Sequence, residues 1–178
     1  MITDADALEH RIINAEVDWG AVYAEQLPRV YNFFRYRVGD GQQAEDLTAT
    51  TFEKAWRSRK RYRRDLAAFS TWLIAIARNV ATDYLRKQRP EVALDNVRGK
   101  VSDNSPEEIA QTHGDFERLD DLLARLPTRE RELIALKYGA DLTNRQIAKL
   151  AGLSESNVST ILHRVIERLR AQWGKDER

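Results

Sequence analysis

The stretch LTNRQIAKLAGLSESNVSTILHRVIERLR, Leu142–Arg170, carries the most specific local pattern in the sequence. Two amphipathic segments lie on either side of Gly152, a residue that suits a tight turn. Each segment follows a polar residue that can cap a helix, Thr143 or Asn144 for the first and Ser154 for the second. The apolar residues recur at helical spacing in both segments: Ile147, Ala148 and Ala151, then Val158, Leu162, Val165 and Leu169. This pattern predicts a helix-turn-helix.

The second helix of this motif has a polar outer face opposite its apolar stripe. At about 100° per residue, that face is formed by Ser156, Ser159, Thr160, His163, Arg164 and Glu167. In a helix that enters a major groove, such side chains can reach base edges or phosphates. The alternative is a helical hairpin packed within a bundle, and for His163 alone an exposed position without a special role explains the sequence as well as a base contact.

Three further amphipathic helices are predicted upstream. Apolar residues recur every three or four positions within residues 19–38, 44–56 and 69–84, and Pro90 ends this block. In the second of these helices we expect the inward residues to be Ala44, Leu47, Phe52, Ala55 and Trp56. No strand pattern or internal repeat is visible, so the sequence predicts an all-α protein made of two small helical domains.

The charge distribution predicts where these domains are divided. The formal net charge is only +1, but residues 19–90 carry a net +7 and residues 122–178 a net +4, while residues 1–18 carry a net −4 and residues 91–121 a net −6. Each basic block can face a polyanion. We therefore expect four parts: an N-terminal extension over residues 1–18 with a short helix around residues 4–16, a helical domain over residues 19–90, an acidic flexible linker over residues 91–117, and the helix-turn-helix domain over residues 118–178.

The run KAWRSRKRYRR, Lys54–Arg64, holds seven cationic side chains and no acid. Together with Phe69 and Trp72 in the following helix, it combines cations for a phosphate backbone with rings on which bases can stack, which suits single-stranded DNA. Three polar residues lie along one edge of that helix and can hold an unstacked base: Asn79, Asp83 and Arg86. The alternative is a solvated basic face over core tryptophans, with Trp56 structural and Asp83 paired locally with Lys87.

The composition excludes several kinds of chemistry. The chain has no cysteine, and its three histidines, His10, His113 and His163, lack the spacing of a metal site, so we expect no disulfide, no thiolate catalysis, no metal and no cofactor. No apolar run approaches the ~20 residues of a membrane-spanning helix, and the acidic N-terminus lacks the features of a secretory signal. We expect a cytoplasmic protein that does not insert into a membrane.

Three segments outside the helix-turn-helix carry motifs that occur in a fixed order. They are AEDLTATTFEKAW (Ala44–Trp56), FSTWLIAIARNVATDYLRKQR (Phe69–Arg89) and RLPTRERELIALKY (Arg125–Tyr138). Followed by the helix-turn-helix, they resemble the extracytoplasmic-function branch of bacterial sigma factors over roughly residues 19–90 and 118–172, and the combination is specific although each motif alone is weak. The resemblance implies a dissociable subunit of RNA polymerase rather than an enzyme, with core polymerase, promoter DNA and an anti-sigma factor as partners.

The resemblance also implies a role for each domain. The first would bind the large polymerase subunit through contacts or their supports at Glu45, Asp46, Leu47 and Phe52. The same domain would melt the −10 element and capture a flipped base, and the residues in question are Lys60, Arg61, Tyr62, Arg63, Arg64, Phe69, Trp72, Asn79, Asp83 and Arg86. The second domain would read the −35 element in the major groove with Ser156, Ser159, Thr160, His163 and Arg164. The acidic linker would thread toward the RNA exit path.

Two places depart from the family pattern. Ala49 and Thr50 replace the usual Gln-Glu, which can weaken or reshape the polymerase contact. Ser159 and Ile161 replace the usual basic residues of the recognition helix, and because Arg164 is then the main cation, we expect weaker binding to free DNA. The other interpretations are a conventional helix-turn-helix regulator that binds duplex DNA without polymerase, and an RNA-binding or structural helical protein. The last explains the basic run but not the helix-turn-helix.

Overall fold

The computed structural model describes residues 19–88 and 108–174, apart from the side chains of residues 108–113. Every element in this part of the chain is helical, which confirms the predicted fold class. The elements are α2 (Trp19–Val38), α3 (Gly41–Ser58), the 3-10 turn η1 (Arg59–Arg61), α4 (Phe69–Gln88), α5 (Glu108–Ala124), α6 (Thr128–Ile134), the π-helical turn η2 (Ala135–Gly139), α7 (Asn144–Ala151) and α8 (Glu155–Trp173). The helix predicted around residues 4–16 and most of the predicted linker lie outside the described residues.

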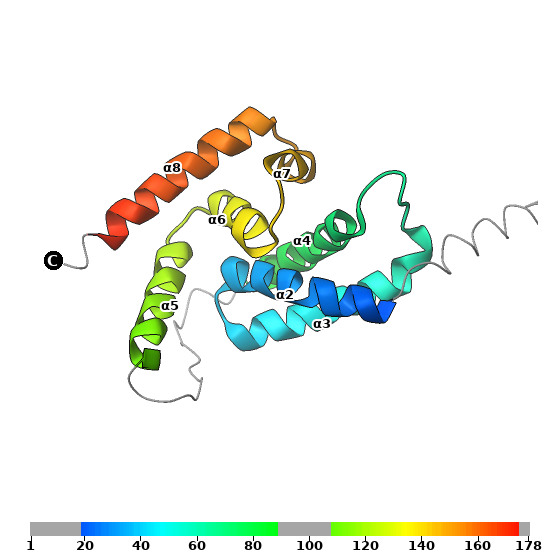
Figure 1. The fold of residues 1–178 in the computed structure, drawn as a ribbon, viewed down its shortest axis with the longest axis horizontal. Coiled ribbons are helices and arrows are strands. Elements are labelled where there is room, and N and C mark those ends of the chain that lie inside the picture. The colour runs from blue at the N-terminus through cyan, green and yellow to red at the C-terminus, as the bar shows by residue number, and fades with distance from the viewer. Residues whose placement is uncertain (1–18, 89–107, 175–178) are drawn as a thin grey trace, which may run out of the picture.

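Figure 1 shows α2, α3 and α4 as one group of helices, the N-terminal bundle, with α5 to α8 as a C-terminal bundle beside it. The core of the N-terminal bundle contains Val30, Phe33, Phe34, Ala44, Ala55, Leu73, Ile74 and Ala77. α2 ends at Val38 because Gly39 adopts a positive φ of 89°. Asp40 then caps α3, and its Oδ1 accepts a hydrogen bond from the backbone N–H of Gln43 at 2.7 Å. The Gly-Asp-Gly stop signal therefore separates two antiparallel helices.

α3 turns a different set of residues inward from the one that we expected. Trp56 is 49% exposed, and Phe52 is only half-buried. Thr48 and Thr51 take the inward positions instead, and the hydroxyl of each donates to the carbonyl four residues earlier, at 2.6 and 2.8 Å. Because these bonds satisfy the hydroxyls within the helix, both threonines can be buried at little cost. A prediction based on apolar residues alone misses them.

α5 begins earlier than we expected. The linker was predicted over residues 91–117, but the helix starts at Glu108, so the last ten residues of that range are helical. The apolar pattern that marks a helix begins only at Phe116, and even this side chain is 60% exposed. Since the sequence has no sustained apolar period before Phe116, the first half of α5 resembles a polar connector.

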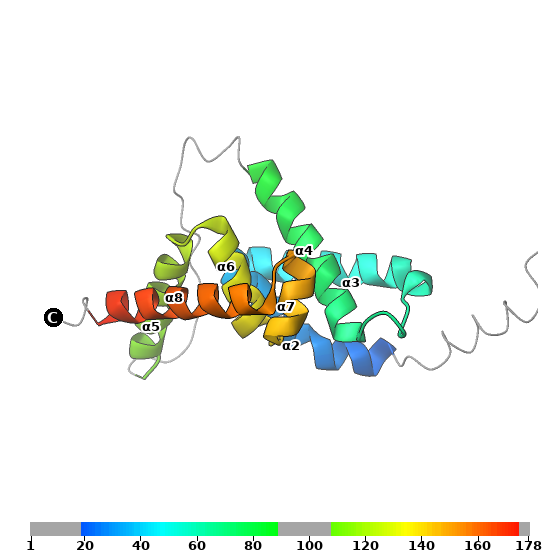
Figure 2. The same ribbon diagram turned by 90° about the horizontal axis from the view of Figure 1, so that it is seen from above.

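The two bundles share one continuous apolar core, in which η2 lies along α2 (Figure 2). Gly139 at the end of η2 is buried at the closest point of this contact. A Cβ atom on residue 139 would lie 2.7 Å from the carbonyl oxygen of Asn32 and 2.8 Å from the Cα atom of Phe33. Both neighbours are backbone atoms, so only glycine fits without a shift of one helix relative to the other.

We predict that Gly139→Ala lowers the free energy of unfolding by about 1–3 kcal/mol, because the added methyl group overpacks this contact. Gly114→Ala is the matched control, since a Cβ there has no atom within 4 Å. In the helix α5 the control should be neutral or stabilising by up to ~1 kcal/mol. Thermal and urea unfolding followed by circular dichroism measures both, and equal midpoints for the two variants would contradict the close approach.

Candidate nucleic-acid interfaces

The helix-turn-helix predicted from the sequence is present in α7 and α8. Thr143 and Gln146 form a capping box at the start of α7, in which the backbone N–H of Gln146 donates to Thr143 Oγ1 at 3.3 Å and that of Thr143 donates to Gln146 Oε1 at 2.8 Å. Gly152 has a positive φ of 64° at the turn. Ser154 caps α8 by accepting from the backbone N–H of Asn157 at 3.2 Å. Each signal in the sequence therefore has its expected structural role.

The outer face of α8 is open to solvent in the part of the chain that the structure describes. Its exposed residues include Ser156, Ser159, Thr160, His163 and Arg164, while Val158, Leu162, Val165 and Leu169 are buried. The Thr160 hydroxyl already donates to the carbonyl oxygen of Ser156 at 3.0 Å, so it is left mainly as an acceptor. Small polar side chains at the N-terminal half of the helix allow a close approach to base edges.

The first helix of the motif adds two cations that our sequence analysis did not single out. Arg145 and Lys149 are exposed and lie four residues apart on α7. In a helix-turn-helix the first helix crosses the phosphate backbone, so these side chains are suited to phosphate contacts. Their i, i+4 spacing on the polar side of a short amphipathic helix is the sequence pattern that predicts these two exposed cations.

The basic run forms an exposed connection between α3 and α4. Lys60, Arg61, Arg63 and Arg64 are all exposed. Arg63 donates to Asp65 at 2.8 Å, and this hydrogen bond lowers the pKa of the Asp65 carboxyl and raises the pKa of the Arg63 guanidinium. Solvent and salt screen an ion pair this exposed, so the contact with Asp65 does not keep Arg63 from binding a polyanion.

A compact turn follows the basic run. Tyr62 is buried, and its hydroxyl donates to the carbonyl oxygen of Ala67 at 3.2 Å. The backbone N–H of Leu66 donates to the carbonyl oxygen of Arg63 at 3.1 Å, which closes the turn. Leu66 itself is 71% exposed. The predicted site residue Tyr62 is therefore buried and fixes the loop through its hydrogen bond to Ala67, whereas the cations on either side of it in the sequence are exposed to solvent.

An aromatic cluster supports this loop. Tyr62, Phe69 and Trp72 lie with ring centroids 5.2–5.3 Å apart, and Trp19 of α2 joins them through Phe69 at 5.4 Å. Trp19 also packs edge-on against Trp56 at 5.3 Å, and the Arg59 guanidinium lies 4.0 Å from the Trp56 ring centroid. Phe69 and Trp72 are half-buried, so each ring is both part of the support and partly accessible. The sequence did not place Trp19 in this group, because its partners lie about 40 to 50 residues away.

The polar edge predicted on α4 is accessible. Asn79 and Arg86 are exposed and Asp83 is half-buried. Arg86 Nη2 lies 3.1 Å from Asp83 Oδ1, so Asp83 pairs with Arg86 and not with Lys87 as the alternative interpretation held. Asn79 is therefore the member of the edge whose amide is most open to a base.

The candidate polymerase-binding residues differ in accessibility. Glu45 and Asp46 are exposed on α3, whereas Leu47 is buried and can act only as a support. Phe52 packs against Tyr23 of α2 with ring centroids 4.6 Å apart. Ala49 is exposed beside the acidic pair, and the Thr50 hydroxyl donates to the carbonyl oxygen of Asp46 at 2.9 Å. The surface available to a partner is thus acidic at one end and aromatic at the other.

Other kinds of site have no support within the described residues. There, no cluster of three or more His, Cys, Asp or Glu side chains is arranged to hold a metal ion. Likewise, none of the described helices has the length and apolar character that a membrane crossing needs.

A helix-turn-helix on one bundle, and an exposed cationic loop next to aromatic rings on the other, are the features of a helical DNA-binding protein. Residues 22–91 match the family model for sigma-70 region 2, and residues 122–171 match that for sigma-70 region 4. The chain belongs to the sigma-70 family, as an extracytoplasmic-function (ECF) RNA polymerase sigma factor. It is a non-enzymatic polymerase subunit that directs promoter recognition, which replaces the alternatives of a conventional regulator or an RNA-binding protein.

Relatives of known function are similar over most of their length. The ECF sigma factor SigM of Bacillus subtilis is 30% identical over 86% of this chain and 94% of its own, and the sigma factor CarQ of Myxococcus xanthus is 33% identical over 88% and 89%. Among solved structures, RpoE in complex with the anti-sigma factor NepR from Bartonella quintana matches with a TM-score of 0.69 and 23% identity over 86% of this chain and 95% of that one. CnrH in complex with the cytosolic domain of CnrY matches with a TM-score of 0.66 and 21% identity over 97% and 99%. These structures share the fold.

The cap of the recognition helix is open to a direct test. We predict that Ser154→Ala costs about 1 kcal/mol of stability, because the N–H of Asn157 loses its acceptor. Ser156→Ala, two residues further along the same helix, removes a hydroxyl that does not cap the helix and should leave the unfolding midpoint nearly unchanged. Chemical unfolding of both variants measures the difference, and equal stability would contradict the capping role.

Proposed function

We propose that the N-terminal bundle melts the −10 element and captures one unpaired base. The observation that carries this proposal is the exposed loop of Lys60, Arg61, Arg63 and Arg64, whose Tyr62 packs in the Tyr62–Phe69–Trp72 cluster. The cations attract the phosphate backbone, and the partly accessible rings offer a stacking surface once a base has left the duplex. Asn79, which is exposed on the same edge of α4 as Asp83 and Arg86, is proposed to hydrogen bond the edge of that base.

The C-terminal bundle is proposed to read the −35 element as intact duplex. Ser156, Ser159, Thr160, His163 and Arg164 face outward on α8 for this purpose, and Arg145 and Lys149 on α7 position the motif on the backbone. We place the region 2 domain at residues 19–90, preceded by the N-terminal extension 1–18. The region 4 domain, predicted at residues 118–178, is extended to include all of α5, and the acidic linker before it is proposed to follow the RNA exit path.

Core polymerase is proposed to bind the exposed side of α3. Glu45 and Asp46 are the proposed contacts, and Leu47 and Phe52 support them from the bundle. Ala49 leaves a smaller and uncharged surface where the family has a polar side chain, so we expect the aromatic end of this face to contribute more of the contact.

An anti-sigma factor is proposed as a second partner. The two solved structures above are complexes with NepR and with the cytosolic domain of CnrY, and their sigma chains share this fold. Such a partner would compete with polymerase or DNA for the surfaces described here. Because polymerase and promoter DNA are its proposed working partners, we place the protein in the bacterial cytoplasm.

Promoter selection tests the function as a whole. Core polymerase with this protein should make abortive RNA from promoters selected out of a library that is randomised in both elements, whereas core alone should not. Duplex binding by the protein without polymerase, and no RNA synthesis with it, would contradict the proposal.

We predict that Asn79→Ala impairs melting more than duplex engagement. The amide is proposed to contact the base only after strand separation, so permanganate reactivity of the −10 element should fall about tenfold at a promoter occupancy close to that of the parent. Gln88→Ala is the control, because Gln88 is exposed and, nine residues after Asn79 at about 100° per residue, lies on the opposite side of the same helix. Equal loss of melting and of occupancy would argue against base capture.

We predict that Arg164→Ala changes the −35 preference and lowers the salt slope of holoenzyme binding by about 0.9 through the loss of one cation. Ser159→Ala should shift the preference with little effect on the slope. Arg170→Ala removes the same charge from the last turn of α8, where Arg170 pairs with Glu167 at 3.0 Å, and should leave the selected sequence unchanged. An identical −35 preference in the parent and in Arg164→Ala would reject the assignment.

A further inference from the structure

The cationic loop between η1 and α4 contains an exposed leucine. Leu66 is 71% exposed, the highest value among the exposed large apolar side chains of the described residues, and Arg63 and Arg64 before it are exposed as well. Single apolar side chains are common on protein surfaces, so exposure alone does not indicate a role. The position of Leu66 does, because the melting and base capture proposed for this loop use its cations and the neighbouring rings and leave the leucine without a function.

The turn that carries Leu66 is held by hydrogen bonds on both sides of it. The Leu66 N–H donates to the carbonyl oxygen of Arg63 at 3.1 Å, and the Tyr62 hydroxyl donates to that of Ala67 at 3.2 Å. The Arg63 guanidinium donates to both carboxylate oxygens of Asp65, at 3.2 and 2.8 Å. A partner that buries Leu66 therefore has to order little of the loop, which favours binding.

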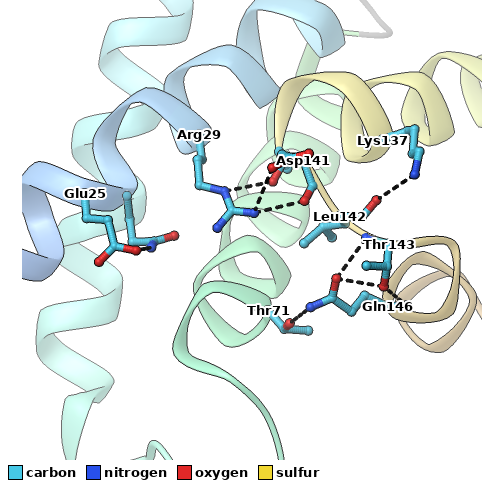
Figure 3. Close-up of polar contacts among 10 residues, drawn as sticks. Glu25, Arg29, Thr71, Lys137, Asp141, Leu142, Thr143 and Gln146 are labelled. Atoms are coloured by element: carbon cyan, nitrogen blue, oxygen red, sulfur yellow. Dashed lines mark hydrogen bonds and ion pairs between the residues drawn. The ribbon is translucent and has the colours of Figure 1, made fainter.

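The loop projects from the N-terminal bundle at the end away from α8, as both ribbon views show (Figure 1, Figure 2). The first turn of α4, which follows the loop, contacts the C-terminal bundle, where Gln146 Nε2 of α7 donates to Thr71 Oγ1 at 3.0 Å (Figure 3). This contact is made after the loop has ended. Since residues 63–66 are all exposed, the loop itself is open to a nucleic acid.

Leu66 is close to the rings on which the captured base is proposed to stack. It lies three residues before Phe69, so the two Cα atoms are at most about 11 Å apart. Tyr62 also packs against Phe69, with ring centroids 5.3 Å apart, so the loop returns to this ring. Since stacked bases repeat every ~3.4 Å along a strand, Leu66 can reach the base stack within about three steps of the captured base.

We propose that Leu66 is a wedge that enters the base stack at the edge of the melted −10 element and takes the place of the captured base as a stacking partner. This inference rests on the proposed function and deepens it, because it adds a second contact to the same melting step. The ligand of Leu66 is a base-pair step of the duplex, whereas Asn79 is proposed to hold the unpaired base. Proteins that unstack a base step commonly insert an apolar side chain such as leucine.

The leucine contributes what the cations of the loop cannot. Phosphates are present in paired and in melted DNA alike, so contacts of Arg63 and Arg64 with them strengthen binding without favouring strand separation. The apolar face of a base pair becomes accessible only when its neighbour has left the stack, and the Leu66 side chain can remove that face from water. An interaction that forms only in the opened state lowers the free energy of that state relative to the closed one.

A promoter that is already open tests the wedge. The whole chain is assembled with core polymerase and supplied with a selected promoter in two forms, one fully paired and one with a mismatched −10 element whose non-template strand is unchanged. We expect Leu66→Ala to lower abortive RNA synthesis from the paired promoter about tenfold, the size expected when one leucine side chain is no longer buried. On the mismatched promoter the variant should match the parent, because strand separation no longer limits RNA synthesis there.

An abasic site at the captured position separates the wedge from base capture. With no base to hold, Asn79→Ala should cause no further loss of melting. Leu66→Ala should still reduce the melting of that promoter, since the neighbouring base pair still lacks a stacking partner. Permanganate reactivity of the −10 element measures the melting in each case.

Two variants act as controls. Leu66→Met keeps an apolar side chain of similar volume and should keep most of the activity on the paired promoter. Phe116→Ala removes another exposed apolar side chain, 60% exposed on α5, and should change RNA synthesis from neither promoter.

Three results would overturn the wedge: equal loss for Leu66→Ala on the paired and the mismatched promoter, full activity of this variant on both, or no effect of it beside the abasic site. Absence of RNA synthesis by the parent from the paired promoter would instead overturn the proposed function itself.

Discussion

The backbone of η2 approaches the backbone of α2 at Gly139 more closely than any side chain would allow. A Cβ atom there would lie 2.7 Å from the Asn32 carbonyl oxygen. This approach buries Ala135, Leu136 and Ala140 against α2 and places the next two carbonyls within reach of Arg29. Asp141 then turns the chain with a positive φ of 53°, just before the cap of α7. The position of the helix-turn-helix on the N-terminal bundle thus depends on a residue that contributes no side chain.

The basic residues named here fall into two groups that the near-neutral net charge of the chain does not reveal. Arg29, Arg35 and Arg78 are half-buried and bind carbonyl oxygens or carboxylates of the other bundle, where each guanidinium serves as a multiple hydrogen-bond donor. Lys60 and Arg164, by contrast, are exposed, and at such positions charge acts over a distance that salt shortens to about 10 Å. The first group sets the arrangement of the fold, and the second group is suited to nucleic acid. Counts of basic residues cannot distinguish the two, because the difference lies only in what each side chain contacts.

The sequence predicts those features of the fold that depend on neighbours along the chain. The Thr143 and Ser154 caps, the turn at Gly152 and the outer face of α8 all follow from local spacing, and the structure has each of them. Prediction from sequence fails where distant residues decide which side chains are buried. It also fails where a polar side chain can be buried because it hydrogen bonds to a carbonyl of its own helix. Thr48 and Thr51 replace Phe52 and Trp56 on the inner side of α3, and the polar start of α5 gives no periodic signal. Trp19 in the aromatic cluster and the Arg29 contact, formed between residues more than 100 positions apart, require the tertiary structure.

Each proposed recognition surface is assembled within its own bundle. The aromatic cluster joins α2, α3 and α4 without any residue from the C-terminal bundle, and the helix-turn-helix is capped by its own Thr143 and Ser154. Neither surface therefore needs residues of the other bundle to be formed. The contact between the bundles combines the close backbone approach at Gly139 with two arginines, Arg37 and Arg131, whose pKa values are lowered chiefly by burial and are raised in part by Glu132 and Asp120 respectively.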